Sequence, residues 1–276
     1  MEKTIAIQGV QGSNHHKVAQ LYFGEEVQLD ECLSFDALVH SLTHEKSSYA
    51  IMALENTIAG SIIPNYALID KNNIHINGEY YLNIHHHLMA LPNQTIEDIS
   101  EVCSHPMALL QCKEYFKQYP HIKLVEDVDT AAVARRIQEK QQKGIAAIAT
   151  KTAAELFELN VLSSEIQTIT SNATRFVILQ KQKPIEDIDQ VDKASLRFEL
   201  DHKRGSLATV LNVMSDCKLN LTKIQSLPII ETPWKYAFFV DVTFESYEDY
   251  TKALSVLEIM STTLKVLGAY KNRRNI

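Results

Sequence analysis

The sequence predicts an α/β protein in which a larger domain with mostly parallel sheets is followed by a smaller βαββαβ unit. Up to about residue 180, short apolar runs alternate with segments whose apolar residues have helical spacing, which is typical of βα units. Many of these runs are apolar throughout, as expected for strands that are buried on both faces. Residues 181–193 are polar and weakly periodic, and they predict a domain boundary.

The elements of the larger domain follow from these two patterns. Strands are predicted where apolar residues run together, and helices where apolar residues recur on one side of the segment. The predicted strands are 5–9, 49–54, 102–103, 122–125, 145–149 and 176–179. The predicted helices are 16–23, 62–71, 106–119, 130–140 and 152–157.

The last part of the chain predicts a compact unit of its own. Residues 196–200 alternate as a half-buried strand does, and residues 207–217 have apolar residues at helical spacing. The other predicted elements are strands 221–229 and 236–244 around a turn at 231–233, helix 250–260 and strand 264–270. The resulting order, βαββαβ, is that of the ferredoxin-like split βαβ arrangement.

Composition excludes several classes of function. The chain has 276 residues, of which 45% are hydrophobic, so it can bury a sizeable core. The net charge is −7, and the only basic cluster, 271–274, predicts a solvated end, so no nucleic-acid partner is expected. No apolar stretch approaches the roughly 20 residues that span a bilayer, so no membrane partner is expected. The first residues lack the apolar core of a signal peptide, and we expect a cytoplasmic protein.

Two sets of potential metal ligands do not predict a metal site. In a strand, His85 and His87 would share one face and His86 would point to the other, and no nearby Cys or carboxylate completes a ligand set. The four cysteines have no paired spacing, and we expect reduced thiols in the core. They are Cys32, Cys103, Cys112 and Cys217.

Polar side chains occur at the ends of several predicted elements. Residues 55–57 (Glu-Asn-Thr) follow a buried strand, and open α/β sheets bind ligands at the C-terminal ends of their strands. Residues 174–176 (Thr-Arg-Phe) bring a hydroxyl, a guanidinium and an aromatic ring to the start of another apolar run. The glycines of 9–12 allow close approach of a ligand to a helix N-terminus. Together with residues 104–106 (Ser-His-Pro), these segments predict an enzyme that acts on a small anionic substrate with a six-membered ring.

Each of these segments also fits a purely structural role. The glycines fit a tight turn, and residues 55–57 fit a capped turn before helix 62–71. Ser104 fits the N-cap of helix 106–119, with Pro106 in its first turn. Residues 129–130 (Asp-Thr) fit an N-cap as well.

The ordered set of motifs resembles the prephenate dehydratase family with a C-terminal ACT domain. The matching pieces are residues 9–16, 55–61, 104–106 with 111–112, 129–132, 146–149 and 172–176. The resemblance implies a catalytic domain at 1–182, with two lobes like those of type II periplasmic binding proteins, at about 1–75 plus 168–182 and at 76–167. It also implies an ACT regulatory domain at 194–272 with ferredoxin-like βαββαβ topology, and ACT pairing implies a homodimer or homotetramer.

The resemblance further implies a reaction and its residues. Prephenate would lose its ring carboxylate as CO2 and its hydroxyl as water, giving phenylpyruvate for L-phenylalanine biosynthesis, with no cofactor. Thr174 would be the essential hydroxyl that donates to the leaving oxygen, and Glu55 would be the acid instead if burial raises its pKa. Arg175 would pair with a carboxylate of the substrate or protein. The neutral donors for the substrate carboxylates would be Asn56, Thr57, Ser104, Gln111 and Thr130, and the motifs also include Phe176, Gly12 and His16.

The sequence departs from the family pattern in three places, two in the expected catalytic domain and one in the expected ACT domain. Residues 12–16 read Gly-Ser-Asn-His-His where the family has Gly-Thr-Phe-Ser-His, and Met107 replaces a common Gln. In the expected ACT domain, the effector motifs would be Gly205-Ser206-Leu207 and Gln225-Ser226-Leu227-Pro228. The second motif lacks the family's Glu and Arg, so we expect weak or absent inhibition by L-phenylalanine.

Other functions stay open at this point. Arogenate dehydratase catalyses the same reaction on the amino-acid analogue, and no residue separates it from prephenate dehydratase. A non-catalytic amino-acid sensor would need neither Thr174 nor Glu55. A secreted solute-binding protein is disfavoured by the missing signal peptide.

Overall fold

The computed structural model describes residues 3–183, 188–229, 232 and 234–274. Contacts divide the chain into two compact units. The first contains Met1–Ser61 and Tyr81–Phe176, and the second contains Ile62–Tyr80 and Val177–Ile276. The domain bounds expected from the sequence, 1–182 and 194–272, stay a prediction. Residues 184–187, in the expected boundary, and two residues of the expected turn, 231 and 233, lie outside the described part.

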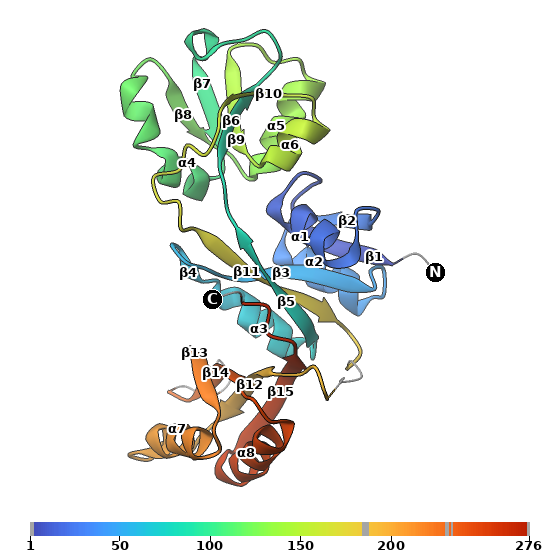
Figure 1. Cartoon of the computed structure of the whole chain (residues 1–276), viewed down its shortest axis with the longest axis vertical. Coiled ribbons are helices and arrows are strands. Elements are labelled where there is room, and N and C mark those ends of the chain that lie inside the picture. The colour runs from blue at the N-terminus through green and yellow to red at the C-terminus, as the bar shows by residue number, and fades with distance from the viewer. Residues whose placement is uncertain (1–2, 184–187, 230–231, 233, 275–276) are drawn as a thin grey trace. The chain divides into compact units, whose positions relative to one another are not determined.

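The first sheet carries the N-terminal elements (Figure 1). Its strand order is β2-β1-β3-β11-β5, with β4 beside β3, and β1 pairs in parallel with both β2 and β3. The strands are β1 Thr4–Gln8, β2 Gln28–Cys32, β3 Tyr49–Asn56, β4 Gly60–Ser61, β5 His75–Asn83 and β11 Ala173–Gln180. Helices α1 Asn14–Phe23 and α2 Phe35–Thr43 connect the first three strands.

The second sheet is mixed. Its order is β10-β6-β9-β7-β8, where β7 is parallel to β8 and β9, but β6 is antiparallel to β9 and β10. The strands are β6 His87–Ala90, β7 Glu101–Ser104, β8 Lys123–Glu126, β9 Ile145–Ala149 and β10 Asn160–Ser163. The helices are α4 Pro106–Cys112, α5 Thr130–Glu139 and α6 Lys151–Leu156, with short 3-10 turns at Ile96–Asp98 and Tyr115–Gln118.

Both faces of the second sheet are covered, as predicted. Ala147 and Ala149 of β9 pack in one cluster with the apolar residues of α5 and α6. The alternate residues, Ala146 and Ile148, pack in another cluster with those of α4. This alternation is what a continuous apolar run such as Ile145–Ala149 predicts for a buried central strand.

Two local predictions were wrong. The helix expected at 106–119 ends at Cys112, because the Gln111 carbonyl accepts a hydrogen bond from Thr168 N (2.9 Å) and the chain then forms a 3-10 turn. His85 and His86 are not in a strand but lie between β5 and β6, so the expected alternation of the three histidines does not hold.

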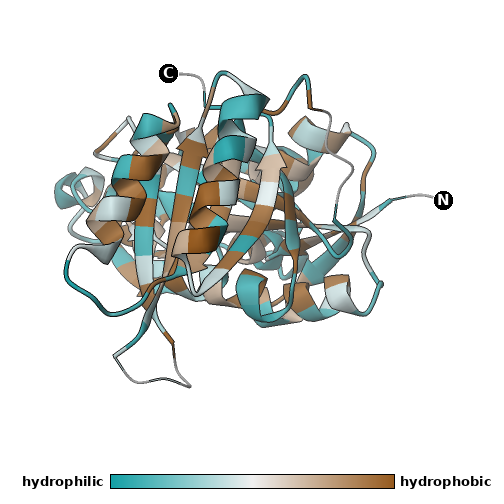
Figure 2. Cartoon of the chain, turned by 90° about the horizontal axis from the view of Figure 1, so that it is seen from below, coloured by the Kyte–Doolittle hydropathy of each residue, from teal (hydrophilic) through white to brown (hydrophobic). Residues whose placement is uncertain are grey.

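The second unit has the predicted βαββαβ order. Its strands form one antiparallel sheet in the order β13-β14-β12-β15. Hydrophobic and hydrophilic residues share its strands and helices (Figure 2), and the apolar ones form a core of their own. The elements are β12 Lys193–Glu199, α7 Ser206–Asp216, β13 Asn220–Pro228, β14 Tyr236–Thr243, α8 Tyr247–Met260 and β15 Thr263–Tyr270. Among the described residues, no helix is long and apolar enough to cross a membrane.

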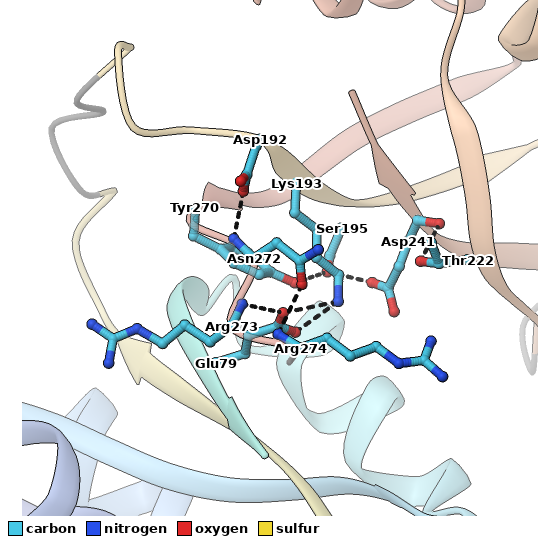
Figure 3. Close-up of polar contacts among 10 residues, drawn as sticks. All are labelled: Glu79, Asp192, Lys193, Ser195, Thr222, Asp241, Tyr270, Asn272, Arg273 and Arg274. Carbon is cyan, nitrogen blue, oxygen red and sulfur yellow. Dashed lines mark hydrogen bonds and ion pairs between the residues drawn. The ribbon is translucent and has the colours of Figure 1, made fainter. Parts of the chain in front are cut away.

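Helix α3 (Ile63–Lys71) and the start of β5 belong to this second unit and are bound to its sheet by specific contacts. Lys265 Nζ donates to Asp70 Oδ1 and to Asp70 O, both at 2.9 Å, near the C-terminal end of the helix, where a cation is favourable. Gly268 packs so closely that a Cβ there would lie 2.1 Å from Ile76 O. Lys193 Nζ donates to both oxygens of Glu79, at 2.9 and 2.8 Å (Figure 3).

The Lys193–Glu79 pair is almost fully buried, with Lys193 2% and Glu79 0% exposed. Breaking such a pair from one side leaves an uncompensated charge in the interior, so Lys193→Met should destabilise the protein by about 3–5 kcal/mol. The double variant Lys193→Met, Glu79→Gln should recover most of this loss, since Gln keeps an oxygen for Arg273 N (3.3 Å). Urea titration followed by circular dichroism measures both.

The matched control is Lys203→Met, which removes an exposed ion pair with Asp201. Exposed pairs contribute little, so its unfolding midpoint should stay close to that of the wild type. Equal losses for the buried and the exposed variant would contradict the prediction.

Candidate active site

The loop after β1 is held by contacts from the second sheet. Gly12 N donates to His16 Nδ1 (2.9 Å), and Gly12 O accepts from Thr150 Oγ1 (2.5 Å). Thr150 is also the N-cap of α6, accepting from Ala153 N at 3.0 Å. Burial, and then the nearby Lys17, lower the pKa of His16, which keeps Nδ1 available as an acceptor. The loop between β1 and α1 therefore has a fixed conformation beside α6.

Two acidic residues lie along the same loop. Asp129, the N-cap of α5, accepts from Ala132 N (2.8 Å), and burial raises the pKa of its carboxyl. A Cβ on Gly9 would lie 2.9 Å from Asp129 Oδ2, so only glycine leaves room for this approach. Glu31 accepts from Gln11 N (2.6 Å) and pairs with Arg135 of α5 (3.2 Å). The positive charge of Arg135, beside this loop, is therefore already balanced by Glu31.

Asn56, the last residue of β3, is fully engaged. Its Oδ1 accepts from the backbone N–H groups of Ile58 and Ala59, both at 2.9 Å. Its Nδ2 donates to Asn172 Oδ1 (2.7 Å) and to Thr174 Oγ1 (3.0 Å), with Ala173 O at 3.3 Å. Asn56 therefore joins the end of β3 to the start of β11.

Asn172 connects Asn56 with helix α4, which packs against the second sheet. Its side chain is 1% exposed, and its Nδ2 donates to Gln111 Oε1 (2.9 Å) on α4. The same Gln111 oxygen is 2.8 Å from His86 Nε2. The backbone of Asn172 is fixed too, because its carbonyl accepts from Ile84 N at 2.7 Å. Asn172 is thus the residue at which β3, α4 and the β5–β6 connection meet.

The Thr174-Arg175-Phe176 segment lies inside β11, where neighbouring side chains point to opposite faces. Thr174 is 8% exposed, and its hydroxyl hydrogen has no acceptor among the described residues. Phe176 shares its face and packs edge-on against His15 (4.9 Å between ring centres). Burial alone lowers the pKa of His15 to about 3. Arg175 is 3% exposed and, by strand alternation, on the face away from Thr174.

The remaining predicted residues lie at the ends of other elements. Glu55 is half-buried and pairs with Ser61 of β4, and Thr57 Oγ1 accepts from Ala173 N (3.0 Å). Thr130 is the first residue of α5, and its hydroxyl makes no hydrogen bond within the described part of the chain. Ser104 donates to Ile148 O (2.7 Å) from the end of β7, fully buried.

The expectation that Ser104 caps α4 was wrong. The N-cap is His105, whose Nδ1 accepts from Met107 N at 3.2 Å. Ser104 cannot serve because the strand continues through it and its hydroxyl is taken by the neighbouring strand β9. Asp129 does cap α5, as its position before Thr130 predicts.

No metal centre emerges from the histidines. His85 Nδ1 is 3.5 Å from Glu165, and His87 is buried at the start of β6. In the described ranges, no three His, Cys, Asp or Glu side chains converge as metal ligands would. Cys32, Cys103 and Cys112 are free and buried, and Cys217 is free and half-buried.

The predicted effector residues lie in the second unit and only partly share a pocket. A pocket of about 240 Å³ is lined by Ser206, Leu207, Trp234 and Tyr236 among others. Gly205 is the N-cap of α7 at φ +83°, next to this pocket lining. The second motif lies on edge strand β13, one strand away from Tyr236 and Phe238. It consists of Gln225, Ser226, Leu227 and Pro228, none of which lines the pocket.

Three residues of the site, Asn172, Thr150 and His86, were not among the predicted site residues, although Asn172 belongs to the motif 172–176. Asn172 and Thr150 each stand next to a strand, and Thr150 has the pattern of an N-cap. His86 was considered only as a metal ligand, although a buried histidine bonded to an amide is the commoner arrangement. What the site offers is a set of neutral donors: the Thr174 hydroxyl, the Gln111 amide and the Thr130 hydroxyl.

Comparison with known proteins places this geometry in a family. A family model described as prephenate dehydratase matches residues 5–184, well over half of the chain. A curated relative named "Arogenate dehydratase/prephenate dehydratase 2, chloroplastic", from Arabidopsis thaliana, is 32% identical over 276 residues, covering 96% of this chain and 72% of the relative. A "Bifunctional chorismate mutase/prephenate dehydratase" from Enterobacter agglomerans is 32% identical over 272 residues, covering 96% and 70%.

Solved structures share the fold along the whole chain. GqqA, described as "a novel type of quorum quenching acylases", is 24% identical with a TM-score of 0.88, covering 98% of this chain and 99% of its own. A prephenate dehydratase from Arthrobacter aurescens in complex with L-Phe is 23% identical with a TM-score of 0.87, covering 98% and 90%. At these identities the likeness concerns the fold alone.

The close approach at Gly12 predicts a stability difference between two glycines. Gly12 (φ +85°) and Gly60 (φ +81°) have nearly the same left-handed backbone, so Ala at either costs about 1–2 kcal/mol in strain. A Cβ on Gly12 would lie 3.0 Å from the backbone Cα of Ala153, whereas nothing lies within 4 Å at Gly60. Overpacking should therefore make Gly12→Ala about 1–3 kcal/mol worse than Gly60→Ala.

Thermal and urea unfolding of the two variants measures this difference, with Gly60→Ala as the control for backbone strain. Equal destabilisation by both substitutions would show that α6 does not press against the loop.

Proposed function

The chain belongs to the prephenate dehydratase family, and from this premise we propose that its site converts prephenate to phenylpyruvate, CO2 and water in L-phenylalanine biosynthesis. The observation that supports the proposal is the hydrogen bonding of the Thr174 hydroxyl. Its oxygen accepts a hydrogen bond from Asn56 Nδ2 at 3.0 Å, while its own hydrogen is not used by the described protein. A hydroxyl held in this way is a ready donor to a leaving oxygen.

The reaction needs such a donor at the leaving oxygen of the substrate. Loss of CO2 from the ring sends an electron pair through the diene and expels hydroxide from the opposite ring carbon, and the ring becomes aromatic. Hydroxide is a poor leaving group, so a hydrogen bond that strengthens as charge develops lowers the barrier. The donation from Asn56 polarises the Thr174 hydroxyl and makes it a better donor. Thr174 then acts by hydrogen bonding while solvent supplies the proton that converts the departing hydroxide to water, with Glu55 at the end of β3 as the alternative source of this proton.

Substrate carboxylates would be bound by neutral donors. Gln111 Nε2 and the Thr130 hydroxyl make no hydrogen bond to a described residue, and the N-terminal end of α5 favours a nearby anion. Thr57 and the loop of Gly12 and His16 complete the surroundings of the substrate. Ser104 is fully buried and donates to Ile148 O, so it would support the site from the end of β7. Arg175 would pair within the protein, since it is buried on the other face of β11. We assign Phe176 to packing against His15.

The fold fits the finer architecture of the family. We propose that the two sheets of the first part are lobes of the type II periplasmic-binding kind, and that the βαββαβ unit is an ACT domain. In that case the pocket beside Ser206 and Leu207 takes an amino-acid effector, and pairing through ACT domains gives a homodimer or homotetramer. No cofactor or metal enters this mechanism.

Arogenate is the second candidate substrate, favoured by a relative whose name contains both activities. Arogenate carries an ammonium where prephenate has a ketone, and it needs an acceptor there. Asp129 and Glu31 are the acidic groups along the β1–α1 loop. Parallel assays of both substrates with the same enzyme distinguish the two.

Replacement of Thr174 tests the catalytic role. Thr174→Ala should lower kcat by about 10²–10⁴ with little change in KM, since the lost hydrogen bond forms fully only in the transition state. Thr174→Ser keeps the hydroxyl and should retain activity to within about tenfold. Phenylpyruvate formation from prephenate at neutral pH is the measurement, with prephenate in buffer without enzyme as the blank for spontaneous aromatisation.

Near-wild-type turnover by Thr174→Ala would refute the assignment of this residue. Absence of turnover by the wild-type enzyme with both prephenate and arogenate would refute the dehydratase itself and favour the amino-acid sensor.

Regulation gives a separate prediction. Gln225 and Leu227 replace the Glu and Arg of the family motif, which removes two charges that would face the zwitterion of L-phenylalanine. Calorimetry should detect weak or no binding of L-phenylalanine, and the kinetics should show little inhibition. Tight binding with inhibition in the wild type would contradict this view.

A further inference from the structure

Asn56 is linked through hydrogen bonds to Thr174, Asn172 and Gln111, and in each of these contacts it is fixed which group donates and which accepts. From this we infer that Asn56 and Asn172 are positioning residues, which fix the hydrogens that Thr174 and Gln111 offer to the substrate, and that neither binds the substrate itself. The catalytic part of the inference rests on the proposed function. The direction of the hydrogen bonds does not, and it is tested separately below.

The direction starts at the backbone. Ile58 N–H and Ala59 N–H both point to one terminal atom of the Asn56 carboxamide at 2.9 Å. A backbone N–H can only donate, so this atom is the oxygen, and the other terminal atom is the NH2 group. The usual ambiguity in the orientation of an amide is thereby removed at this position.

Both hydrogens of the Asn56 NH2 group go to protein acceptors. One faces Asn172 Oδ1 at 2.7 Å, and the other faces Thr174 Oγ1 at 3.0 Å, with Ala173 O nearby at 3.3 Å. An NH2 group has only two hydrogens, so Asn56 has none left for a carboxylate of the substrate. From the end of β3, Asn56 instead donates one of these hydrogens to the Thr174 hydroxyl.

The orientation of the Asn56 amide in turn fixes those of the Asn172 and Gln111 amides. Because Asn172 Oδ1 accepts from Asn56, its NH2 group must face Gln111, whose terminal atom at 2.9 Å is then the oxygen. That oxygen is also 2.8 Å from His86 Nε2, so His86 must carry a hydrogen on Nε2. Burial lowers the pKa of His86, which keeps the ring neutral.

Within the described part of the chain, two donor groups are left free by this arrangement, one at each end: the Thr174 hydroxyl with one hydrogen and the Gln111 NH2 group with two. Thr174 accepts from Asn56, so its hydroxyl hydrogen points elsewhere. Gln111 accepts twice through its oxygen, so its NH2 group has no partner in the described chain. One donor suits the leaving oxygen and the other suits a carboxylate. A polar network with every internal contact satisfied can hold both without moving.

The test is Asn56→Asp, which reverses the chain of hydrogen bonds with almost no change in shape. One carboxylate oxygen still accepts from Ile58 and Ala59, but the other now attracts the Thr174 hydrogen away from the substrate. We expect kcat to fall by about 100-fold or more, as in Thr174→Ala, although Thr174 is still present. Asn172 should turn its NH2 group to the new carboxylate, Gln111 should turn in response, and the His86 hydrogen should move from Nε2 to Nδ1.

The His86 tautomer is measured by 15N NMR of the imidazole rings, with the His86 signal assigned by its loss in His86→Gln. Wild-type His86 should be the neutral Nε2–H form, and Asn56→Asp should convert it to Nδ1–H. Asn83→Asp is the matched control: it adds the same charge at an exposed position at the end of β5 and should change neither kcat nor the tautomer.

Two results would overturn the inference. An Nδ1–H tautomer in the wild type would contradict the direction of the hydrogen bonds, and this measurement needs no variant to fold. A kcat within about threefold of the wild type in Asn56→Asp, with a raised KM alone, would make Asn56 a substrate ligand. If the wild type turns over neither substrate, the proposed function fails, whereas the tautomer still decides the direction of the hydrogen bonds.

Discussion

Two backbone N–H groups, those of Ile58 and Ala59, bind the oxygen of Asn56, and the arrangement of the site depends on this contact. Backbone groups cannot rotate or titrate, so they impose a direction that side chains alone would not keep. Through Asn172 this direction reaches Gln111 on helix α4, which packs against the second sheet. A turn of three residues after β3 thus sets the orientation of the Asn172 amide, which lies 116 positions from Asn56 in the sequence.

Much of the fold was predictable because burial leaves a strong periodic signal. The continuous apolar runs 49–54 and 145–149 became central strands covered by helices, and the βαββαβ order of the last unit was found as predicted. The signal failed where strands are short or exposed. Strand β2 (Gln28–Cys32) is largely polar and half-exposed at a sheet edge, so neither its period nor its composition identifies it. The mixed sheet was not predicted because its antiparallel strands, β6 and β10, were not predicted as strands.

The site was predictable at its strand ends but not in its connections. Asn56 and Thr174 are marked by their place beside apolar runs, whereas the role of Asn172 depends on a hydrogen bond to Gln111, 61 positions away. Local sequence patterns do not encode such contacts. Helix α4 shows the same effect: its apolar spacing continues to Tyr119, but a hydrogen bond from Thr168 to the Gln111 carbonyl ends it early. A tertiary contact has overridden local helical preference there.

The neutral character of the site follows from the proposed reaction. The ring carboxylate of prephenate departs as CO2, so its negative charge is lost as the transition state forms. A cation paired to it would stabilise the ground state more than the transition state and would slow the step. In agreement, Arg135 is paired with Glu31, and Arg175 is buried on the far face of β11. Amide and hydroxyl donors hold the substrate without stabilising the ground state in this way. The strengthened hydrogen bond from Thr174 acts at the leaving oxygen, where negative charge develops, and not at the ring carboxylate, where it is lost.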